Sequence, residues 1–187
     1  MAEIIVLTGT PGAGKTTVLD KAIDLVDSDV SVINYADVML ETGKDSGLGS
    51  DHDKIRKLKV EQQIKLQKKA AENIAKKAEG ITVVDTHSTI KTKNGYLPGL
   101  PEWVVKALKP KTIVLVEAGA EEIIGRRNTD ESRERDKEDA DKIELHQKIN
   151  RSAVSASAVL TGATIKIVEN HDNKLKEAAE NLAEILK

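Results

Sequence analysis

The 187-residue sequence contains no cysteine and no phenylalanine, and it has only one tryptophan and two tyrosines. Without cysteine, disulfide bonds and zinc sites built from thiolates are excluded. Without phenylalanine, the core must be built mainly from Val, Ile, Leu and Ala. The hydrophobic share of 39% and the charged share of 32% are still typical of a globular chain, long enough for one domain with a real core.

The sequence also lacks an excess of either charge and any long apolar run. Lys plus Arg number 29 and Asp plus Glu number 31, so the net charge of −2 gives no global attraction to nucleic acid or anionic membranes. No run approaches the roughly 20 apolar residues of a membrane span. The apolar run 4–7 is too short for a signal peptide and has no basic segment before it. We therefore expect a cytoplasmic protein with no membrane or nucleic-acid partner, in which any anion site is local.

Short runs of β-forming residues alternate with helical patterns along the chain. Strands are predicted at residues 4–7, 30–33, 81–85, 112–117 and 163–168, and helices at 16–26, 61–79 and 174–187. Because the run 4–7 lacks polar alternation, it reads as a strand buried on both faces. The pattern predicts βαβ units with right-handed crossovers, and therefore an α/β fold with a five-stranded parallel sheet between helical layers.

Two polar segments interrupt this alternation. Residues 43–53 are polar and rich in glycine, which predicts a loop. Residues 128–141 are almost entirely charged or polar, and they are either the start of an exposed helix or a flap.

A glycine-rich turn joins the first predicted strand to the first predicted helix. It carries the phosphate-loop pattern Gly-x-x-x-x-Gly-Lys-Thr, with one further threonine: Gly9, Thr10, Pro11, Gly12, Ala13, Gly14, Lys15, Thr16 and Thr17. The glycines let backbone N–H groups converge on phosphate oxygens, and the helix N-terminus adds partial positive charge. Lys15 can then reach the β- and γ-phosphates of ATP, and the Thr16 hydroxyl can bind Mg²⁺. A chance glycine turn is the alternative, but the strand, turn and helix context favours the phosphate site.

Asp85 ends the third predicted strand. In a parallel sheet, the carboxyl ends of the strands line the ligand crevice. There its carboxylate can hold a Mg²⁺-bound water beside Thr16. A cap on the turn at 86–88 is the alternative. The residues after Asp85 lack the glycine of a GTPase switch, and 170–172 do not form a guanine-binding motif. An ATPase and a small-molecule kinase therefore stay as the competing classes.

Arginines recur where a migrating phosphoryl group would need cations. They are Arg56, Arg126, Arg127, Arg133, Arg135 and Arg151. One planar guanidinium group can bind two phosphate oxygens at once. The alternative is an ion-paired surface, which we favour for Arg127 and Arg151. His87 is either a general base or a hydrogen-bonded turn residue. An acceptor that is itself a phosphate needs no base, since its oxygen is already anionic.

These motifs, in this order, resemble the archaeal-type adenylate kinases of the P-loop nucleoside monophosphate kinases. The resemblance covers nearly the whole chain and is most specific at 84–92 and 95–101. It extends to residues 9–17, 53–58, 126–128, 133–136, 146–151 and 160–164. It implies the reaction ATP + AMP ⇌ 2 ADP with Mg²⁺, and members of this type are often homotrimers.

The resemblance also implies a division of the chain and roles for its arginines. The core would comprise 1–36, 78–127 and 143–187, with an AMP-binding arm at about 37–77 and a short lid at about 128–142. Arg56 would bind the AMP phosphate, and Arg126 would lie against ATP at the lid hinge. Arg133 and Arg135 would close on the phosphates, so the implied catalytic residues are Lys15, Arg56, Arg126 and Arg135.

The sequence departs from the bacterial adenylate kinases after the third strand. Their Asp-Gly-x-Pro-Arg is here Asp85-Thr86-His87-Ser88-Thr89, so the phosphate-binding arginine is missing and Lys91 is the candidate substitute. Two alternatives stay open: a kinase for another nucleoside monophosphate or small acceptor, and a P-loop ATPase that works as an assembly or RNA-associated factor.

Overall fold

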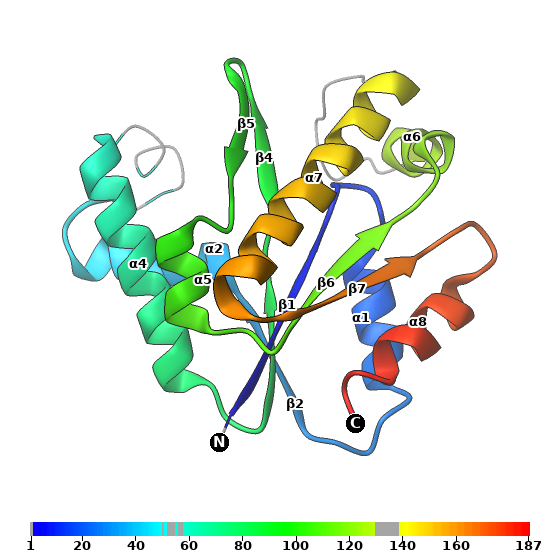
Figure 1. Ribbon diagram of the computed structural model, residues 1–187, viewed down its shortest axis with the longest axis horizontal. Helices are drawn as coiled ribbons and strands as arrows, with labels where there is room; N and C mark the ends of the chain where they lie inside the picture. Colours follow the sequence, from blue (N-terminus) through cyan, green and yellow to red (C-terminus); the bar gives the residue numbers. More distant parts are fainter. Residues whose placement is uncertain (1, 50, 52–54, 56–57, 130–138) are drawn as a thin grey trace.

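The computed structural model describes residues 2–49, 51, 55, 58–129 and 139–187. Strands and helices alternate along the chain (Figure 1). In chain order they are β1 (Glu3–Gly9), α1 (Lys15–Ile23), β2 (Val30–Asn34), α2 (Tyr35–Asp45), α4 (Val60–Lys77), β3 (Ile81–Asp85), β4 (Thr89–Thr92), β5 (Gly95–Pro98), α5 (Glu102–Leu108), β6 (Thr112–Glu117), α6 (Ala120–Thr129), α7 (Ala140–Thr161), β7 (Thr164–Glu169) and α8 (Leu175–Ala183).

The central sheet has five parallel strands, as the sequence pattern predicts, and the structure gives their order as β2-β3-β1-β6-β7. The chain first builds outward from β1 to β2 and returns to β3, and it then crosses β1 to place β6 and β7 on the other side. The direction of winding therefore reverses at β1. In open parallel sheets, ligands bind outside the carboxyl ends of the strands at this reversal. Gly9 of β1 and Asp85 of β3 both lie there.

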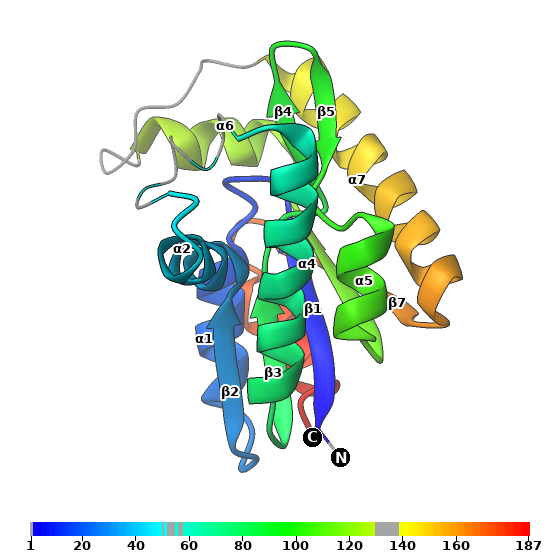
Figure 2. The same cartoon turned by 90° about the vertical axis from the view of Figure 1, so that its left-hand side faces the viewer.

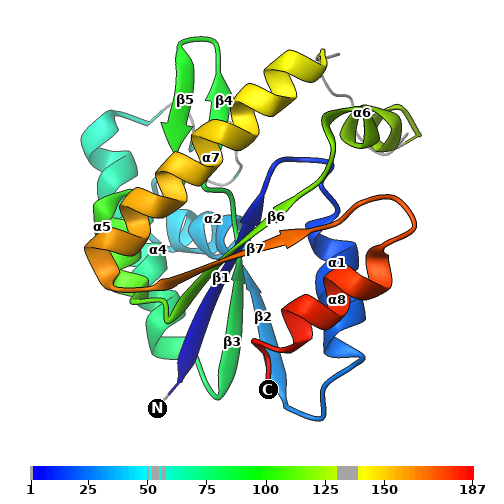
Figure 3. The ribbon, with the colours of Figure 1, turned by 45° about the vertical axis from the view of Figure 1, so that its right-hand side comes forward.

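Helices cover both faces of the sheet, which confirms the three-layer architecture (Figure 3). Successive side chains of a strand point to opposite faces. Ile5 and Leu7 accordingly pack in the cluster that contains α1 and α8, and Ile4 and Val6 pack in the cluster that contains α2, α4, α5 and α7. Both clusters are aliphatic, except that Tyr35 and Trp103 join the second one.

The loop expected at residues 43–53 is wrong at its first residues, because α2 continues to Asp45. Asn34 caps this helix by accepting hydrogen bonds from the backbone N–H groups of Ala36 and Asp37. Further along, Thr42 and Gly43 are buried, and the Thr42 hydroxyl accepts a hydrogen bond from Asn73 Nδ2 on α4 at 3.2 Å. Figure 2 shows α2 lying beside α4. Tertiary packing here overrides the low helix propensity of glycine.

The antiparallel hairpin of β4 and β5 is not among the predicted elements; it rises beyond the carboxyl ends of the sheet next to α7 (Figures 1 and 3). Its two-residue turn is followed by Gly95, whose φ of 118° lies in the region that favours glycine. The Tyr96 ring of this hairpin packs against the His146 ring of α7, with centroids 4.8 Å apart. Within the described residues, no helix is long and apolar enough to cross a membrane.

Candidate functional site: the phosphate loop and its supports

The phosphate loop connects β1 to α1 at the reversal point of the sheet. Gly12 and Gly14 have φ angles of 93° and 86°, which side chains with a Cβ rarely adopt, and Gly14 caps α1. A Cβ on Gly14 would collide with the Asn170 amide, and one on Gly9 would collide with the Val116 carbonyl. The glycines are therefore required both by backbone conformation and by the close approach of β6 and the segment after β7.

The structure brings together the two charged residues that the sequence analysis places at the centre of this site. Lys15 Nζ donates a hydrogen bond to Asp85 Oδ1 and a second one, of 2.9 Å, to the Thr86 carbonyl. The two side chains are only 11% and 22% exposed, so water screens this ion pair incompletely. The lysine amine lies at the carboxyl end of β3, one strand away from its own loop.

Thr16 and Thr17 lie exposed in the first turn of α1. The Thr16 hydroxyl and the Asp85 carboxylate are oxygen donors, the type of ligand that Mg²⁺ prefers. Among the described residues, no group of three or more His, Asp or Glu side chains could hold a metal ion. This donor set fits Mg²⁺, which commonly uses only one or two protein side chains and fills its other positions with phosphate oxygens and water.

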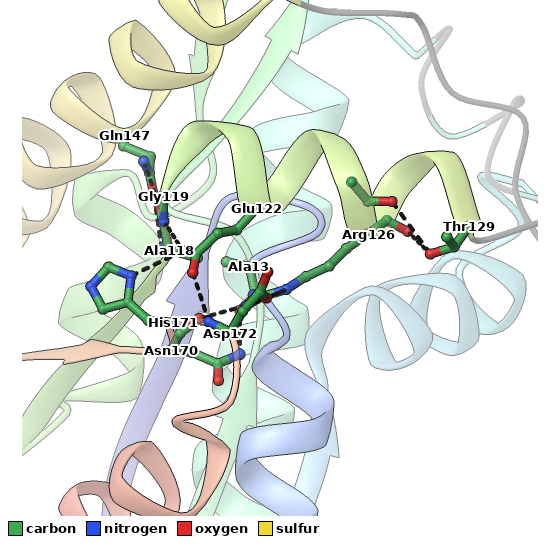
Figure 4. A network of polar contacts seen from close by, with 11 residues as sticks. Ala13, Ala118, Gly119, Glu122, Arg126, Thr129, Gln147, Asn170, His171 and Asp172 are labelled. Atoms are coloured by element: carbon green, nitrogen blue, oxygen red, sulfur yellow. Dashed lines mark hydrogen bonds and ion pairs between the residues drawn. The ribbon is translucent and has the colours of Figure 1, made fainter.

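Arg126, in the last turns of α6, links this helix to the phosphate loop and to the segment after β7 (Figure 4). Its guanidinium donates to the Ala13 carbonyl at 3.3 Å and to the Asn170 carbonyl at 2.8 Å. Nε and Nη2 also donate to Asp172 Oδ1, at 3.1 and 2.6 Å. Arg126, the arginine expected at the lid hinge, therefore lies against the phosphate loop.

Glu122 holds the same segment one turn earlier on α6 (Figure 4). Its carboxylate accepts hydrogen bonds from the backbone N–H groups of Gly119 and Asp172, each at 2.6 Å, and it lies 2.9 Å from His171 Nδ1. The Asp172 N–H lowers the pKa of Glu122 to about 2, with help from His171. The pKa of His171 is raised in turn, chiefly by its hydrogen bond to Glu122.

Arg127 and Arg151, which the sequence analysis assigned to ion-paired surface, have different environments. Arg127 donates from Nε and Nη2 to the Pro11 carbonyl, at 2.9 and 2.7 Å, so it supports the phosphate loop directly. Arg151 donates from Nε to both carboxylate oxygens of Glu117, at 2.8 and 3.0 Å. Glu117 is the last residue of β6 and is only 5% exposed, so its ion pair with Arg151 links α7 to the end of this strand.

His87 follows Asp85 by two residues and is largely enclosed. Burial lowers the pKa of His87, and the charge of Lys15 lowers it further, so the imidazole is neutral near pH 7. In the described part of the chain, no group hydrogen-bonds its Nδ1. Both interpretations of His87, as a base or as a turn residue, are compatible with a neutral ring.

Three site residues of the sequence analysis, Arg56, Arg133 and Arg135, lie outside the described residues. Conversely, two asparagines with direct contacts to the phosphate loop were missed. Asn170 donates from Nδ2 to the Ala13 carbonyl at 2.8 Å, and Asn150 donates to the Thr10 hydroxyl at 3.0 Å. The available signals for Asn150 were its place in the segment 146–151 of the family resemblance and its position four residues after His146 on one face of a helix.

A phosphate loop at the reversal point of a five-stranded parallel sheet, with its lysine against an acidic strand end, defines a P-loop nucleoside triphosphate-binding protein. Comparisons with known proteins agree. A family model described as an AAA domain matches residues 8–144. A shikimate kinase from Acinetobacter baumannii, solved with shikimate, shares the fold: its TM-score is 0.59 at 15% identity, over 100% of this chain and 93% of that one.

Closer relatives give the particular family. The chain is 51% identical to an adenylate kinase of Methanopyrus kandleri, over 100% of this chain and 99% of the relative. It is 47% identical to an adenylate kinase of Methanothermobacter thermautotrophicus, over 98% of this chain and 99% of that relative. The chain belongs to the adenylate kinase family.

Proposed function

We propose that this chain is an adenylate kinase, which transfers the γ-phosphoryl group of ATP to AMP in a reversible reaction that gives two ADP. The observation that carries the proposal is the position of Lys15, whose amine extends from the donor loop to Asp85 and Thr86 at the end of β3. Full-length similarity to curated adenylate kinases supports the same reaction.

The described residues support the following account of the donor side of the reaction. Backbone N–H groups of the phosphate loop and the N-terminus of α1 bind the phosphates of ATP. Lys15 then exchanges its hydrogen bond to Asp85 for phosphate oxygens, because a phosphate chain carries more negative charge than one carboxylate. Arg126, held against Ala13 and Asn170, adds a second cation beside the loop.

Magnesium would be held by the Thr16 hydroxyl and, through a bound water, by Asp85. When bound, the ion neutralises charge on the β- and γ-phosphates. With Lys15 bonded to phosphate oxygens, the Asp85 carboxylate would be available for this role. Lys15 and Asp85 thus change partners together when the donor binds.

On the acceptor side we assign Arg56 to the AMP phosphate, and Arg133 and Arg135 to the phosphates enclosed by the lid. The arm at about 37–77 and the lid at about 128–142 would close and exclude water, which protects ATP from hydrolysis. The AMP phosphate is already an anion, so positioning and charge neutralisation suffice without a general base. A homotrimer, on the strength of the resemblance, and a cytoplasmic location, on the strength of the composition, complete the proposal.

The test is a screen of acceptors with ATP and Mg²⁺, in which ADP formation is measured for each nucleoside monophosphate, for shikimate, for glucose and without acceptor. We expect sustained turnover with AMP and only slow hydrolysis in its absence. Turnover with another nucleoside monophosphate or small acceptor, but not AMP, would identify a different kinase. Acceptor-free hydrolysis stimulated by RNA or a protein partner would identify an ATPase.

A further inference from the structure

Asn150 lies on α7, 1% exposed, between the phosphate loop and the turn that follows β3. Its Nδ2 donates to Thr10 Oγ1 at 3.0 Å. Its Oδ1 accepts from Ser88 Oγ at 2.8 Å and from Thr89 Oγ1 at 2.6 Å. One buried amide therefore joins two segments that are more than 70 residues apart in sequence, one on each side of the β1–β3 boundary.

The distances fix the orientation of this amide. The two short contacts are typical of O–H···O hydrogen bonds, and the longer one is typical of N–H···O. The oxygen of Asn150 therefore faces Ser88 and Thr89, and its nitrogen faces Thr10. All the polar groups involved are buried and hydrogen-bonded, so removing one of them would leave another buried polar group without its partner.

The orientation continues beyond Asn150. Because the Thr89 hydroxyl gives its proton to Asn150, it can only accept at its contact of 3.1 Å with His146 Nε2, so His146 is the donor there. His146 in turn packs against Tyr96 of the hairpin. The chain of donors runs from His146 through Thr89 and Asn150 to the Thr10 hydroxyl of the phosphate loop.

The two segments joined by Asn150 are the phosphate loop, which leads into Lys15, and the turn after the strand end that Lys15 contacts. Thr10 belongs to the donor loop, and Ser88 and Thr89 follow the Asp85–Thr86 pair that binds Lys15. In-line transfer requires donor and acceptor to be held within a fraction of an ångström, and a displacement of 1 Å can lower the rate by about 100-fold. Asn150, from a third element, α7, bonds directly to both segments.

We propose that Asn150 is a positioning residue of phosphoryl transfer, which holds the donor loop in register with the turn after β3. This inference rests on the proposed function. It predicts a loss in kcat rather than in nucleotide affinity, because Asn150 is buried behind the loop and its amide bonds are all to protein groups.

The test compares Asn150→Ala with Ser157→Ala. Ser157 lies two turns further along α7, is 3% exposed, and donates to the Leu100 and Ala153 carbonyls, far from the loop in the hydrogen-bond network. We expect Asn150→Ala to lower kcat by about 100-fold while the KM values for ATP and AMP change by less than about threefold. Ser157→Ala should keep kcat within about twofold of the unaltered chain.

A second pair of variants keeps the proposal testable if Asn150→Ala does not fold. Thr89→Val preserves shape but removes the hydroxyl between His146 and Asn150, and should lower kcat by about 10-fold. Thr89→Ser restores the hydroxyl and should recover most of that loss. A kcat of Asn150→Ala within about threefold of the unaltered chain, or equal losses in Thr89→Val and Thr89→Ser, would overturn the proposal.

The unaltered chain, measured in the same assays, separates this inference from the proposed function. Failure of the unaltered chain to phosphorylate AMP contradicts the proposed function alone. The Asn150 ratios are then measured with the acceptor that the unaltered chain does use.

Discussion

At the scale of single residues, Lys15 is the group whose removal should be most costly to activity. Replacement by methionine keeps the length of the side chain but deletes the cation that bonds to Asp85 and would bind the phosphates. We expect Lys15→Met to lower kcat by about 10²- to 10³-fold, as does loss of one charge-stabilising donor in other enzymes. Steady-state ADP formation from ATP and AMP measures the change.

The matched control is Lys21→Met on the same helix. Lys21 is 49% exposed and pairs with Asp24 at 3.4 Å, an interaction that contributes little in water. It should leave kcat unchanged. A Lys15→Met enzyme with a kcat near that of Lys21→Met would contradict the assigned role of Lys15.

Gly14 tests whether the loop conformation itself matters. Its φ of 86° and its contact with Asn170 predict that Gly14→Ala strains the backbone by about 1–2 kcal/mol and displaces the Asn170 amide. Binding of ATP should weaken and the free energy of unfolding should fall. Calorimetric titration and urea denaturation measure the two effects.

Gly125→Ala is the contrasting change, since Gly125 is exposed inside α6 and a Cβ there meets nothing within 4 Å. It should raise the free energy of unfolding by roughly 0.5–1 kcal/mol. If both variants stabilised the protein, the steric account of Gly14 would be wrong.

Some residues of the site can be predicted from a local sequence pattern, and others cannot. Lys15 and the glycines carry a local pattern, and Asp85 is found because it ends a buried run. Asn150 and Asn170 carry no local pattern, because their partners Thr10 and Ala13 are 140 and 157 residues away in sequence. A hydrogen bond across that separation exists only once the sheet order is known.

At the scale of elements, Glu122 joins the start of α6 to the segment after β7, and this junction should be sensitive to acid. The pKa of Glu122 is lowered from 4.5 to about 2 in the folded protein. A lowered carboxyl pKa contributes stability that is present above the unfolded value and is lost as pH falls through the folded one. The free energy of unfolding should therefore decline between about pH 4.5 and pH 2.

Glu122→Gln should be less stable than the unaltered chain at neutral pH and should show a smaller decline in that acid range. Urea denaturation at a series of pH values measures both. Glu121→Gln removes the same charge from the neighbouring, exposed position and should keep the pH dependence of the unaltered chain. An equally steep decline in Glu122→Gln would show that other groups cause it.

The elements themselves were predictable where the sequence pattern is strong. The runs 81–85 and 112–117 match β3 and β6, because strands buried on both faces are continuous apolar runs. The hairpin of β4 and β5 was missed because its outer residues Ile90 and Leu97 are exposed and its runs are four residues each. Its Asn94-Gly95 pair was the turn signal available.

At the scale of the whole molecule, the α/β class, the parallel sheet and the three layers follow from the alternation of patterns, but the strand order does not. That β6 lies beside β1 rather than β3 is a long-range pairing that no local pattern of the sequence indicates. Because the strands are parallel, the residues at their carboxyl ends, among them Asp85 and Lys15, lie at one end of the molecule, where Arg126 also contacts the phosphate loop.

The proposed donor and acceptor sites face one another, so one ligand that fills both should raise the thermal stability of the folded chain. A double-headed ATP–AMP analogue engages both sites, and a ligand that binds only the native state stabilises it by about 2.7 kcal/mol at 100 times its dissociation constant. For a chain of this length that corresponds to a rise in Tm of about 5–10 °C. ATP alone, at the same concentration, should raise Tm less, because it leaves the acceptor side unbound.

An analogue with a shorter phosphate bridge is the control: it should act like ATP, since it cannot span the two sites. Equal shifts from ATP and from both analogues, measured by scanning calorimetry, would contradict two facing nucleotide sites in one chain.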